Sequence, residues 1–482
     1  MAHSTNAPTP RLPHAFSEQM RQLLGAEYEA FEAALTEPAP VSIRLNPFKT
    51  VDAGRWMVDG RLTANAAEPS AVHRPPSTVA WHPLGFYLAE RPVFTLDPAF
   101  HAGAYYVQEA SSMFLHEALR QSVDFSKALK VLDLCAAPGG KSTLLASLLN
   151  AESLLVANEV IRTRAAPLRE NLERWGCPNV AVTSAEADEF AEKLPDWFDV
   201  VVADAPCSGE GMFRKDPDAV GEWSPAHVQL CAGRQRRILA AAVATLAPGG
   251  ILAYSTCTYN HAENAENAAW LAEEFGMKPL KTNTLPEWGI VGTDGGGLQF
   301  FPHRVRGEGF FIAVFRKPDE GEVARLPQPS TFKSLTPLAK NLLPEMSRWL
   351  AAPGDSSFFQ TPTGEVLALP AGLLPEYLTL DKALKIKWFG TAVGEFKGKD
   401  FAPAHALALS QIAAPSLPAL DLDRDTALRF LRKETFEPPT DAPRGWAVVR
   451  FEGLNLGWVK ILPNRLNNYL PAERRIRMRG EE

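Results

Sequence analysis

Two cysteines and an aspartate stand among small and polar residues, each just after an apolar run. Asp204 and Cys207 lie in DAPCSGEG, which follows VVVA, and Cys257 lies in STCT, which follows GILAY. A lone cysteine is more often a small buried hydrophobe than a nucleophile. Here the polar surroundings of both cysteines favour chemistry, because a thiolate is a strong nucleophile that forms covalent intermediates.

A tight turn of small residues forms a second candidate site. VLDLCAAPGGKSTLLASLL, residues 131–149, predicts a strand, a turn and a helix in direct succession. Gly139 and Gly140 let a ligand approach the backbone where a side chain would block it. A phosphate-binding P-loop is excluded, because that motif requires Gly where this chain has Cys135. The dinucleotide pattern GxGxxG is also absent, so a Rossmann-like nucleoside site remains.

Glu159 extends this nucleoside-type pattern. It ends the apolar run LLVANE and lies 24 residues after Cys135. Rossmann-like sites place an acidic residue about 20 residues after the turn, where it binds ribose hydroxyls. Alone, Glu159 would be read as an exposed loop carboxylate. Together with the turn, it is a candidate ribose ligand.

The elements that must position these groups alternate between strands and helices. Helix-length segments separate six apolar runs between about residue 105 and Lys317: VLDL, LLVAN, NVAVT, DVVVAD, GGILAYS and FFIAVF. This alternation predicts an α/β fold with a mostly parallel sheet covered on both faces. Open α/β sheets bind ligands at the carboxyl ends of their strands. We therefore expect Asp204, Cys207 and Cys257 to converge beside the glycine turn.

Segments without this regular alternation of strands and helices flank the core. We predict an N-terminal domain of mixed α+β type over 1–105, a core over 106–318, a middle C-terminal domain over 331–405 and a last domain over 406–482. The polar, Pro-containing stretch 318–330 is typical of a linker. Two strands joined through Gly453 and Asn455 are expected within 445–462.

The composition excludes several classes of protein. The 482 residues are 46% hydrophobic and 22% charged with a net charge of −7, which excludes a disordered chain and a uniformly basic nucleic-acid coat. Five cysteines without a CxxC pair argue against a disulfide scaffold and a Cys-rich zinc site. The N-terminus has no apolar signal segment, and no stretch suits a membrane span. We expect a cytoplasmic monomer with reduced thiols, no metal and no membrane partner.

Together the motifs resemble the NOL1/NOP2/Sun family of RNA 5-methylcytosine methyltransferases. The segments that carry the resemblance are RLNP (43–46), CAAPGGK (135–141), Glu159, DAPCSG (204–209), STCT (255–258) and GEGFFIA (307–313). Their combination is far more specific than the glycine turn alone. The C-terminal part resembles the appended domains of bacterial members that modify 16S rRNA, which end in a PUA-like RNA-binding domain. The resemblance implies a Rossmann-like S-adenosylmethionine methyltransferase core acting on 16S rRNA or the small ribosomal subunit.

The resemblance also implies roles for individual residues. S-adenosylmethionine would bind Cys135, Ala136, Ala137, Pro138, Gly139, Gly140, Lys141, Glu159 and Asp204. Cys257 would be the nucleophile that attacks carbon 6 of cytosine, and Cys207 would assist release of the product. Asp204 would also face the ring nitrogen next to the amino group of the base.

The residues that would contact the adenine ring and the RNA are less clearly indicated by the sequence. By spacing, the adenine contact falls on Glu186, where the family more often has Asp, and Ser184 and Asp188 are rivals. RNA-binding proteins use stacking aromatics and phosphate-binding Arg and Lys. The candidates of these types are Phe213, Arg214, Lys215 and Arg304, with Met212, His303 and Arg306 nearby and a basic tail at 472–480.

Three alternative functions remain open. In a DNA cytosine methyltransferase the Pro-Cys cysteine is the nucleophile, and here that would be Cys207. A transfer-RNA substrate is a nearer alternative. A ribosome-assembly factor that has only kept the fold would need neither thiol, so Asp204, Cys207 and Cys257 argue against it.

Overall fold

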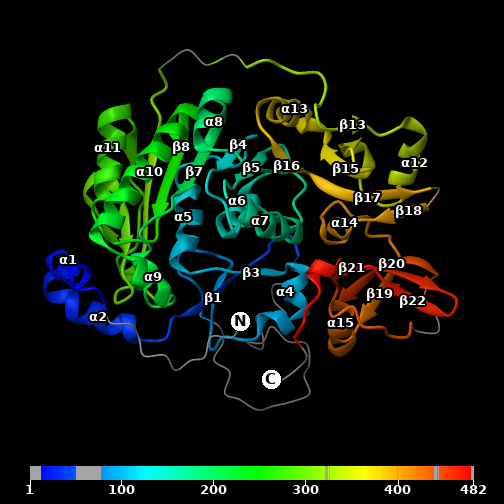
Figure 1. Cartoon of the computed structure of the whole chain (residues 1–482), viewed down its shortest axis with the longest axis horizontal. Helices are drawn as coiled ribbons and strands as arrows, with labels where there is room; N and C mark the ends of the chain where they lie inside the picture. Colours follow the sequence, from blue (N-terminus) through cyan, green and yellow to red (C-terminus); the bar gives the residue numbers. More distant parts are fainter. Residues whose placement is uncertain are drawn as a thin grey trace.

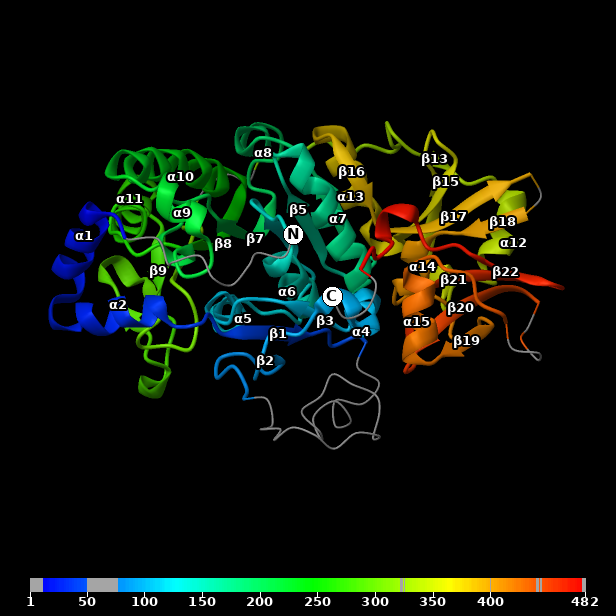
Figure 2. The same cartoon turned by 60° about the horizontal axis from the view of Figure 1, so that its bottom comes forward.

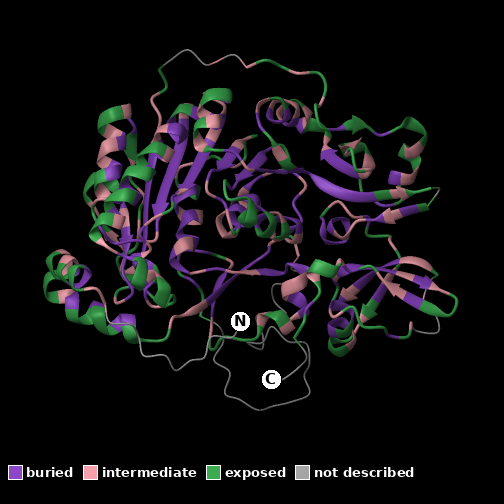
Figure 3. Ribbon diagram, in the orientation of Figure 1, coloured by how far each residue is buried: buried purple, intermediate pink, exposed green. Residues whose placement is uncertain are grey.

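The computed structural model describes residues 12–49, 77–320, 324, 326–398, 400–438, 442 and 444–478. Within them the chain forms sheets of three, ten, five and four strands. The ten-stranded sheet lies at the centre of the molecule (Figure 1), and its central strands are buried along most of their length (Figure 3). This sheet is the frame on which the candidate site is built.

The N-terminal segment begins with helices and ends in a small sheet. Its helices are α1 (His14–Leu24), α2 (Tyr28–Thr36) and α4 (Pro98–Ala102). Its strands are β1 (Val41–Leu45), β2 (Gly85–Leu88) and β3 (Tyr105–Val107), in the order β2-β1-β3 with antiparallel pairing. Phe16, Met20 and Phe31 are buried, as the helical spacing of these apolar residues predicts.

The central sheet confirms the predicted α/β core. Five parallel strands run in the order β8-β7-β4-β5-β6. Their bounds are β4 (Lys130–Asp133), β5 (Leu154–Asn158), β6 (Val180–Thr183), β7 (Phe198–Asp204) and β8 (Leu246–Thr256). Antiparallel strands extend the sheet beyond β8: β9 (Lys278–Leu280), β10 (Val291–Gly292), β11 (Leu298–Phe300) and β12 (Phe310–Arg316). The strand order reverses between β4 and β7, so the carboxyl ends of these two strands flank a ligand crevice.

Helices cover both faces of this sheet. One face packs on α5 (Phe114–Arg120), α6 (Gly140–Leu148) and α7 (Arg162–Trp175). The other packs on α8 (Ala187–Lys193), α10 (Pro225–Thr245) and α11 (Ala265–Phe275). The short helix α9 (Pro217–Glu222) packs with α1 and α2, at the lower left of Figure 1. The buried strands read as continuous apolar runs because side chains cover them on both sides.

The next part of the chain shares its core with the central sheet. β13 (Thr336–Pro337), β14 (Ser356–Gln360), β15 (Glu365–Pro370), β17 (Thr391–Lys397) and β18 (Asp400–Pro403) form the five-stranded sheet, accompanied by α12 (Leu343–Met346) and α13 (Leu374–Ala383). β16 (Ile386–Phe389) instead pairs antiparallel with β6 and covers that edge of the central sheet. Tyr377 and Leu380 of α13 belong to the same buried cluster as the core helices.

The last part of the chain packs against the N-terminal sheet. Its elements are α14 (His405–Leu409), β19 (Ala419–Leu422), α15 (Arg424–Leu431), β20 (Gly445–Phe451), β21 (Leu454–Leu462) and β22 (Arg465–Asn468). β20 and β21 form the expected hairpin, but it turns at Glu452 and Gly453, and Asn455 lies within β21, paired with Arg450. Phe86 and Tyr105 share a buried cluster with Phe430 and Val449, and α4 lies beside this part in both views (Figures 1 and 2). None of the described helices is long and apolar enough to cross a membrane.

Candidate active site

The two cysteine segments meet at the carboxyl ends of β7 and β8. Asp204 is the last residue of β7 and pairs in register with Ser255 of β8, so Cys207 and Cys257 follow neighbouring strands. The two sulfur atoms lie 3.0 Å apart, and the backbone N–H of Cys257 donates to Cys207 Sγ at 3.3 Å. Both thiols are free and partly exposed. One substrate group can therefore reach both.

A partly exposed ion pair lies beside the thiols. Lys141, the second residue of α6, places Nζ 2.8 Å from Asp204 Oδ2, and the Ser255 hydroxyl donates to Asp204 Oδ1 at 2.7 Å. Burial alone would lower the pKa of Lys141, but the Asp204 carboxylate outweighs this and raises it. Lys141 also lies over the ring of Phe310, with Nζ 5.2 Å from the ring centre. The strand ends thus hold a fixed charge pair next to two nucleophilic atoms.

The protonation of Cys207 differs from that of an ordinary exposed thiol. Its hydrogen bond with Cys257, together with burial, raises the pKa of the Cys207 thiol well above its usual value. At neutral pH Cys207 is therefore an S–H group that can donate to Cys257. Burial likewise raises the pKa of Cys135, with Asp133 and Asp204 adding to the effect, so this third thiol is inert.

The glycine turn is anchored to both neighbouring strands. The N–H of Leu134 donates to Val202 O at 2.9 Å, and that of Ala136 donates to Asn158 O at 2.8 Å. Gly139 has a φ of 113°, a left-handed conformation that favours glycine. Residues 136–139 therefore pass over the sheet edge, and α6 begins directly behind them at Gly140.

Two residues at this edge escaped the sequence analysis. Asp133 is fully buried at the end of β4, and its Oδ2 accepts the Ser142 hydroxyl at 2.6 Å. Within the described residues its Oδ1 has no hydrogen-bond partner, and burial, aided by Asp204, raises its pKa to about 7. Asn158 at the end of β5 bonds to the backbone of Leu134 and Ala185 and so ties two turns together. Asp133 interrupts the apolar run VLDL and Asn158 ends the run LLVAN, and these positions are the only signals that could have marked them.

The acidic candidates have different surroundings. Glu159 is buried after β5; its Oε1 accepts the N–H of Ile161 at 2.8 Å, and its Oε2 lies 3.8 Å from Arg164. Glu186 is exposed and caps α8, where it forms a capping box with Glu189. The helix cap alone explains an acidic residue at this position.

A buried arginine from the RLNP segment braces the turn. Arg44 donates to Gln108 Oε1 (2.8 Å), to Gly140 O (3.2 Å) and to the Thr143 hydroxyl (2.6 Å), and its guanidinium lies over the ring of Trp175. These acceptors are all uncharged, and burial lowers the pKa of Arg44 to about 9. The N-terminal segment therefore fixes the first turn of α6.

The residues expected to contact RNA are largely engaged within the protein. Phe213 is buried in a cluster with Phe16 and Trp223, so its ring is covered and not exposed for stacking. Arg214 is 5% exposed and bonds to Glu308, Gly307 O and Ala34 O. The sequence analysis missed these contacts because the covering residues come from distant segments.

The remaining cationic candidates are partly free. Lys215 stays 30% exposed, with Nζ 3.4 Å from Glu308. Arg304 and His303 both bind Glu27 of the N-terminal helices. In the basic tail, Arg474 is held by Glu170 and Glu173 of the core, whereas Arg475 and Arg477 are exposed. The tail is described only as far as Met478.

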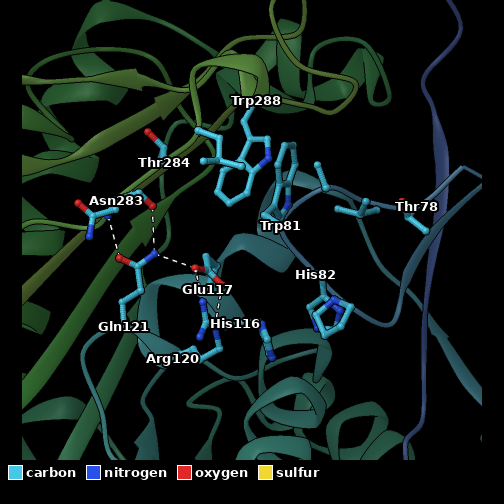
Figure 4. A pocket seen from close by; sticks show the side chains of 14 residues that line it. Thr78, Trp81, His82, His116, Glu117, Arg120, Gln121, Asn283, Thr284 and Trp288 are labelled. Carbon is cyan, nitrogen blue, oxygen red and sulfur yellow. Dashed lines mark hydrogen bonds and ion pairs between the residues drawn. The ribbon is translucent and has the colours of Figure 1, made fainter.

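A separate cavity of about 670 Å³ lies beside α5 (Figure 4). Several of its polar groups bind one another: Arg120 pairs with Glu117, and Gln121 exchanges hydrogen bonds with the backbone of Asn283. His116 Nδ1 has no hydrogen-bond partner among the described residues. Burial lowers the pKa of His82 in its wall to about 2, so that imidazole is neutral. No residue of the cysteine segments lines this cavity, which is distinct from the candidate active site. In the described part of the chain no group of His, Cys, Asp and Glu could hold a metal ion.

Three family models match separate parts of the chain, and curated relatives match nearly all of it. Residues 122–316 match the model of the 16S rRNA methyltransferase RsmB/F, residues 12–110 that of the N-terminal domain of 16S rRNA methyltransferase RsmF, and residues 417–476 that of the RsmF PUA domain. Ribosomal RNA small subunit methyltransferase F from Cronobacter sakazakii is 32% identical over 96% of both chains. The protein of that name from Vibrio vulnificus is 31% identical over 96% of this chain and 97% of its own.

Solved structures show the same core. A methyltransferase homologue from Pyrococcus horikoshii aligns with a TM-score of 0.52 and 28% identity, over 63% of this chain and 94% of its own. NSun6 from the same organism shares the fold, with a TM-score of 0.52 and 21% identity over 64% of this chain and 99% of its own. The protein is thus a methyltransferase, and it belongs to the family of ribosomal RNA small subunit methyltransferase F.

Proposed function

We propose that this protein methylates carbon 5 of a cytosine in 16S rRNA through a covalent bond between Cys257 and the base. The observation that carries the proposal is the pair of free thiols, 3.0 Å apart, beside the ion pair of Asp204 and Lys141. A protein that only binds RNA needs neither thiol. The names of the relatives, which refer to small-subunit rRNA, support 16S rRNA as the substrate.

Residues 135–141, Glu159 and Asp204 would hold S-adenosylmethionine, which supplies an electrophilic methyl group. The residues present fit such a group. Gly139 and Gly140 lie against Leu168 and Tyr106, so the lack of a side chain there serves packing of the turn. The fit to the cofactor rests on Glu159, whose carboxylate directly follows the neighbouring strand. Asp133 Oδ1, buried without a partner in the described residues, adds an acceptor at the same edge. Glu186 stays a weaker candidate for the adenine contact, because it is exposed and caps a helix.

The side chains of the site can activate the base. Carbon 5 of cytosine is a poor nucleophile, and covalent addition at carbon 6 makes it enamine-like. The Cys257 thiolate forms the sulfur–carbon bond and the ring nitrogen next to the amino group takes up a proton from solvent, so that the Asp204 carboxylate, paired with Lys141, can accept a hydrogen bond from the N–H that forms. After methylation the hydrogen on carbon 5 leaves as a proton to solvent, its electron pair restores the ring double bond and expels Cys257, and the ring nitrogen releases its proton. Cys207, held as a thiol, can donate its proton to the departing sulfur.

The substrate is tested by transfer of a radiolabelled methyl group. Naked 16S rRNA, small ribosomal subunits, transfer RNA and DNA are each incubated with the protein and labelled S-adenosylmethionine, and the products are digested to nucleosides. We expect label in 5-methylcytosine from 16S rRNA or the subunit. Label confined to transfer RNA or DNA would refute the proposed substrate. No label in any of the four would favour a role in ribosome assembly without catalysis.

A further inference from the structure

A fully buried carboxylate connects the Cys207 segment to the Cys257 segment. Glu210 lies three residues after Cys207, and its Oε2 accepts the backbone N–H groups of Tyr259 (2.8 Å) and Asn260 (3.0 Å), just beyond Cys257. The other donors to this carboxylate are the Thr258 hydroxyl and side-chain N–H groups of Gln19, Trp223 and Asn260. Six hydrogen bonds thus converge on one side chain.

A second buried carboxylate makes the reverse connection. Glu263 lies six residues after Cys257, and its Oε2 accepts the backbone N–H of Ser208 at 3.0 Å, next to Cys207. Gln235 and Asn260 donate to the same carboxylate, each at 2.7 Å. Each cysteine segment therefore gives a carboxylate to the backbone of the other.

The partners of both carboxylates in the described part of the chain are uncharged donors. A buried charge without a cation is costly unless hydrogen bonds replace its hydration. Burial raises the pKa of Glu263, and its bonds to Ser208 and Asn260 oppose that rise. Hydrogen bonds to an ionised acceptor are shorter and about twice as strong as neutral ones, so each carboxylate draws its donors to fixed positions.

We propose that Glu210 and Glu263 are positioning residues that hold the Cys207 and Cys257 thiols in reactive register. The backbone groups they bind lie one to three residues from the two sulfur atoms. A further hydrogen bond, from the backbone N–H of Gly211 to Cys257 O at 2.8 Å, joins the same two segments directly. The effect on catalysis rests on the proposed covalent function, but the effect on thiol geometry does not.

An amide cannot replace the Glu210 carboxylate without moving the segments. Oε2 faces the backbone N–H groups of Tyr259 and Asn260, and Oε1 faces the side-chain N–H groups of Gln19 and Trp223. A glutamine would therefore direct its NH₂ group at an N–H donor in either orientation. Glu210→Gln keeps the size of the side chain and removes both its charge and its capacity to accept on both sides.

The thiol geometry can be measured without catalysis by cross-linking with dibromobimane. The reagent forms two sulfur–carbon bonds and releases two bromide ions and two protons, so it needs no oxidant. Cys207→Ala identifies the signal that belongs to the thiol pair. Asp381→Asn is the matched control, because Asp381 is a buried carboxylate that accepts the backbone N–H of Lys333 and the Ser334 hydroxyl far from the site.

We expect Glu210→Gln and Glu263→Gln to cross-link more slowly than the wild type, while Asp381→Asn cross-links at the wild-type rate. In methylation of 16S rRNA, kcat should fall on the order of 10²-fold, as for a misplacement of about 1 Å, with unchanged affinity for S-adenosylmethionine. Glu210→Asp keeps the charge but shortens its reach; it should cross-link slowly too, and it replaces Glu210→Gln if that variant does not fold.

Wild-type cross-linking rates in folded Glu210→Gln and Glu263→Gln would overturn the proposal. Equal slowing in Asp381→Asn would also overturn it, because the effect would then be general loosening. If the Glu210 and Glu263 variants cross-link slowly but the wild type methylates no RNA, the positioning role stands and the proposed function fails.

Discussion

Two adjacent stretches of one loop use their polar groups in opposite ways. In 204–209, Asp204 and Cys207 stay partly exposed at the sheet edge, where Asp204 pairs with Lys141 and Cys207 lies against Cys257. In 212–215, Phe213 is buried, and Arg214 bonds to a buried carboxylate and two carbonyls. The first stretch, the reactive edge, stays accessible to a substrate, whereas the second, the anchor, is bound within the protein. The residue types alone do not separate the two, because both stretches are polar and follow the same strand.

Removing the anchor should have the largest effect on stability. Arg214→Ala leaves the Glu308 carboxylate buried with its main cation lost, and breaking such a pair costs about 3–5 kcal/mol of unfolding free energy. Urea unfolding measures this cost. Lys215→Ala, on the partly exposed neighbour, should cost much less. If Arg214→Ala instead weakens RNA binding and leaves the unfolding curve unchanged, Arg214 belongs to the RNA surface and the contrast fails.

Asp133, which is fully buried next to the reactive edge, should make the stability of the protein depend on pH. Burial raises the pKa of Asp133 to about 7 in the folded protein, above its unfolded value of about 3.9. The folded protein therefore holds an extra proton between these values. The associated stability is complete below pH 3.9 and is lost as the pH rises through 7.

Asp133→Asn removes this titration. From pH 5 to pH 8 the variant should gain stability relative to the wild type by roughly 2–3 kcal/mol, at about 1.4 kcal/mol per pH unit. Urea unfolding of both proteins at the two pH values gives the difference. A difference that does not change with pH would show that Asp133 is ionised throughout this range.

Glu159 and Glu186, the two acidic candidates for cofactor binding, differ in the same way, because Glu159 is buried at the sheet edge and Glu186 is exposed. Glu159→Ala should weaken binding of S-adenosylmethionine by roughly 1–3 kcal/mol, the cost of leaving buried polar groups unpaired. Glu186→Ala should leave the affinity unchanged, because that carboxylate is exposed and caps a helix. Calorimetry compares the two variants. A larger loss of affinity in Glu186→Ala than in Glu159→Ala would place the cofactor site nearer to α8.

The smallest effect is expected at the exposed basic tail. Replacing Arg475 and Arg477 by Ala removes two exposed cations, whereas Arg474→Ala removes one that is bound to the core. If both tail arginines meet phosphates, the slope of log K against log salt should flatten by about 0.7 for each on single-stranded RNA. Filter binding at several salt concentrations measures it. An unchanged slope would assign RNA contact to another surface.

The sequence predicted the elements that end directly at a motif. VVVA leads into Asp204, and GILAY leads into Cys257. Because the two strands are parallel neighbours, the sheet brings both segments together without help from contacts elsewhere in the chain. The alternation of strands with helices and the hairpin at Gly453 followed from similarly local signals. Local patterns suffice here because strand ends share one edge.

Contacts between distant segments were not predictable in this way. Phe213 is buried only because α1 brings Phe16 against it. Glu210 and Glu263 stand in polar loops and resemble solvent-exposed acids until the donors that surround them converge in space. β16 is a short run, IKWF, whose sequence does not indicate which sheet it joins. Burial of a polar residue depends on partners that a single sequence does not identify.

The order of events at the two thiols tests the central claim most directly. Cys207→Ala should still let Cys257 attack and the methyl group transfer, but the product should stay attached. The variant should accumulate a protein–RNA adduct that survives denaturing gel electrophoresis and carries the labelled methyl group. Cys257→Ala and the double variant should form no adduct. An adduct with Cys257→Ala but none with Cys207→Ala would contradict the account and make Cys207 the nucleophile.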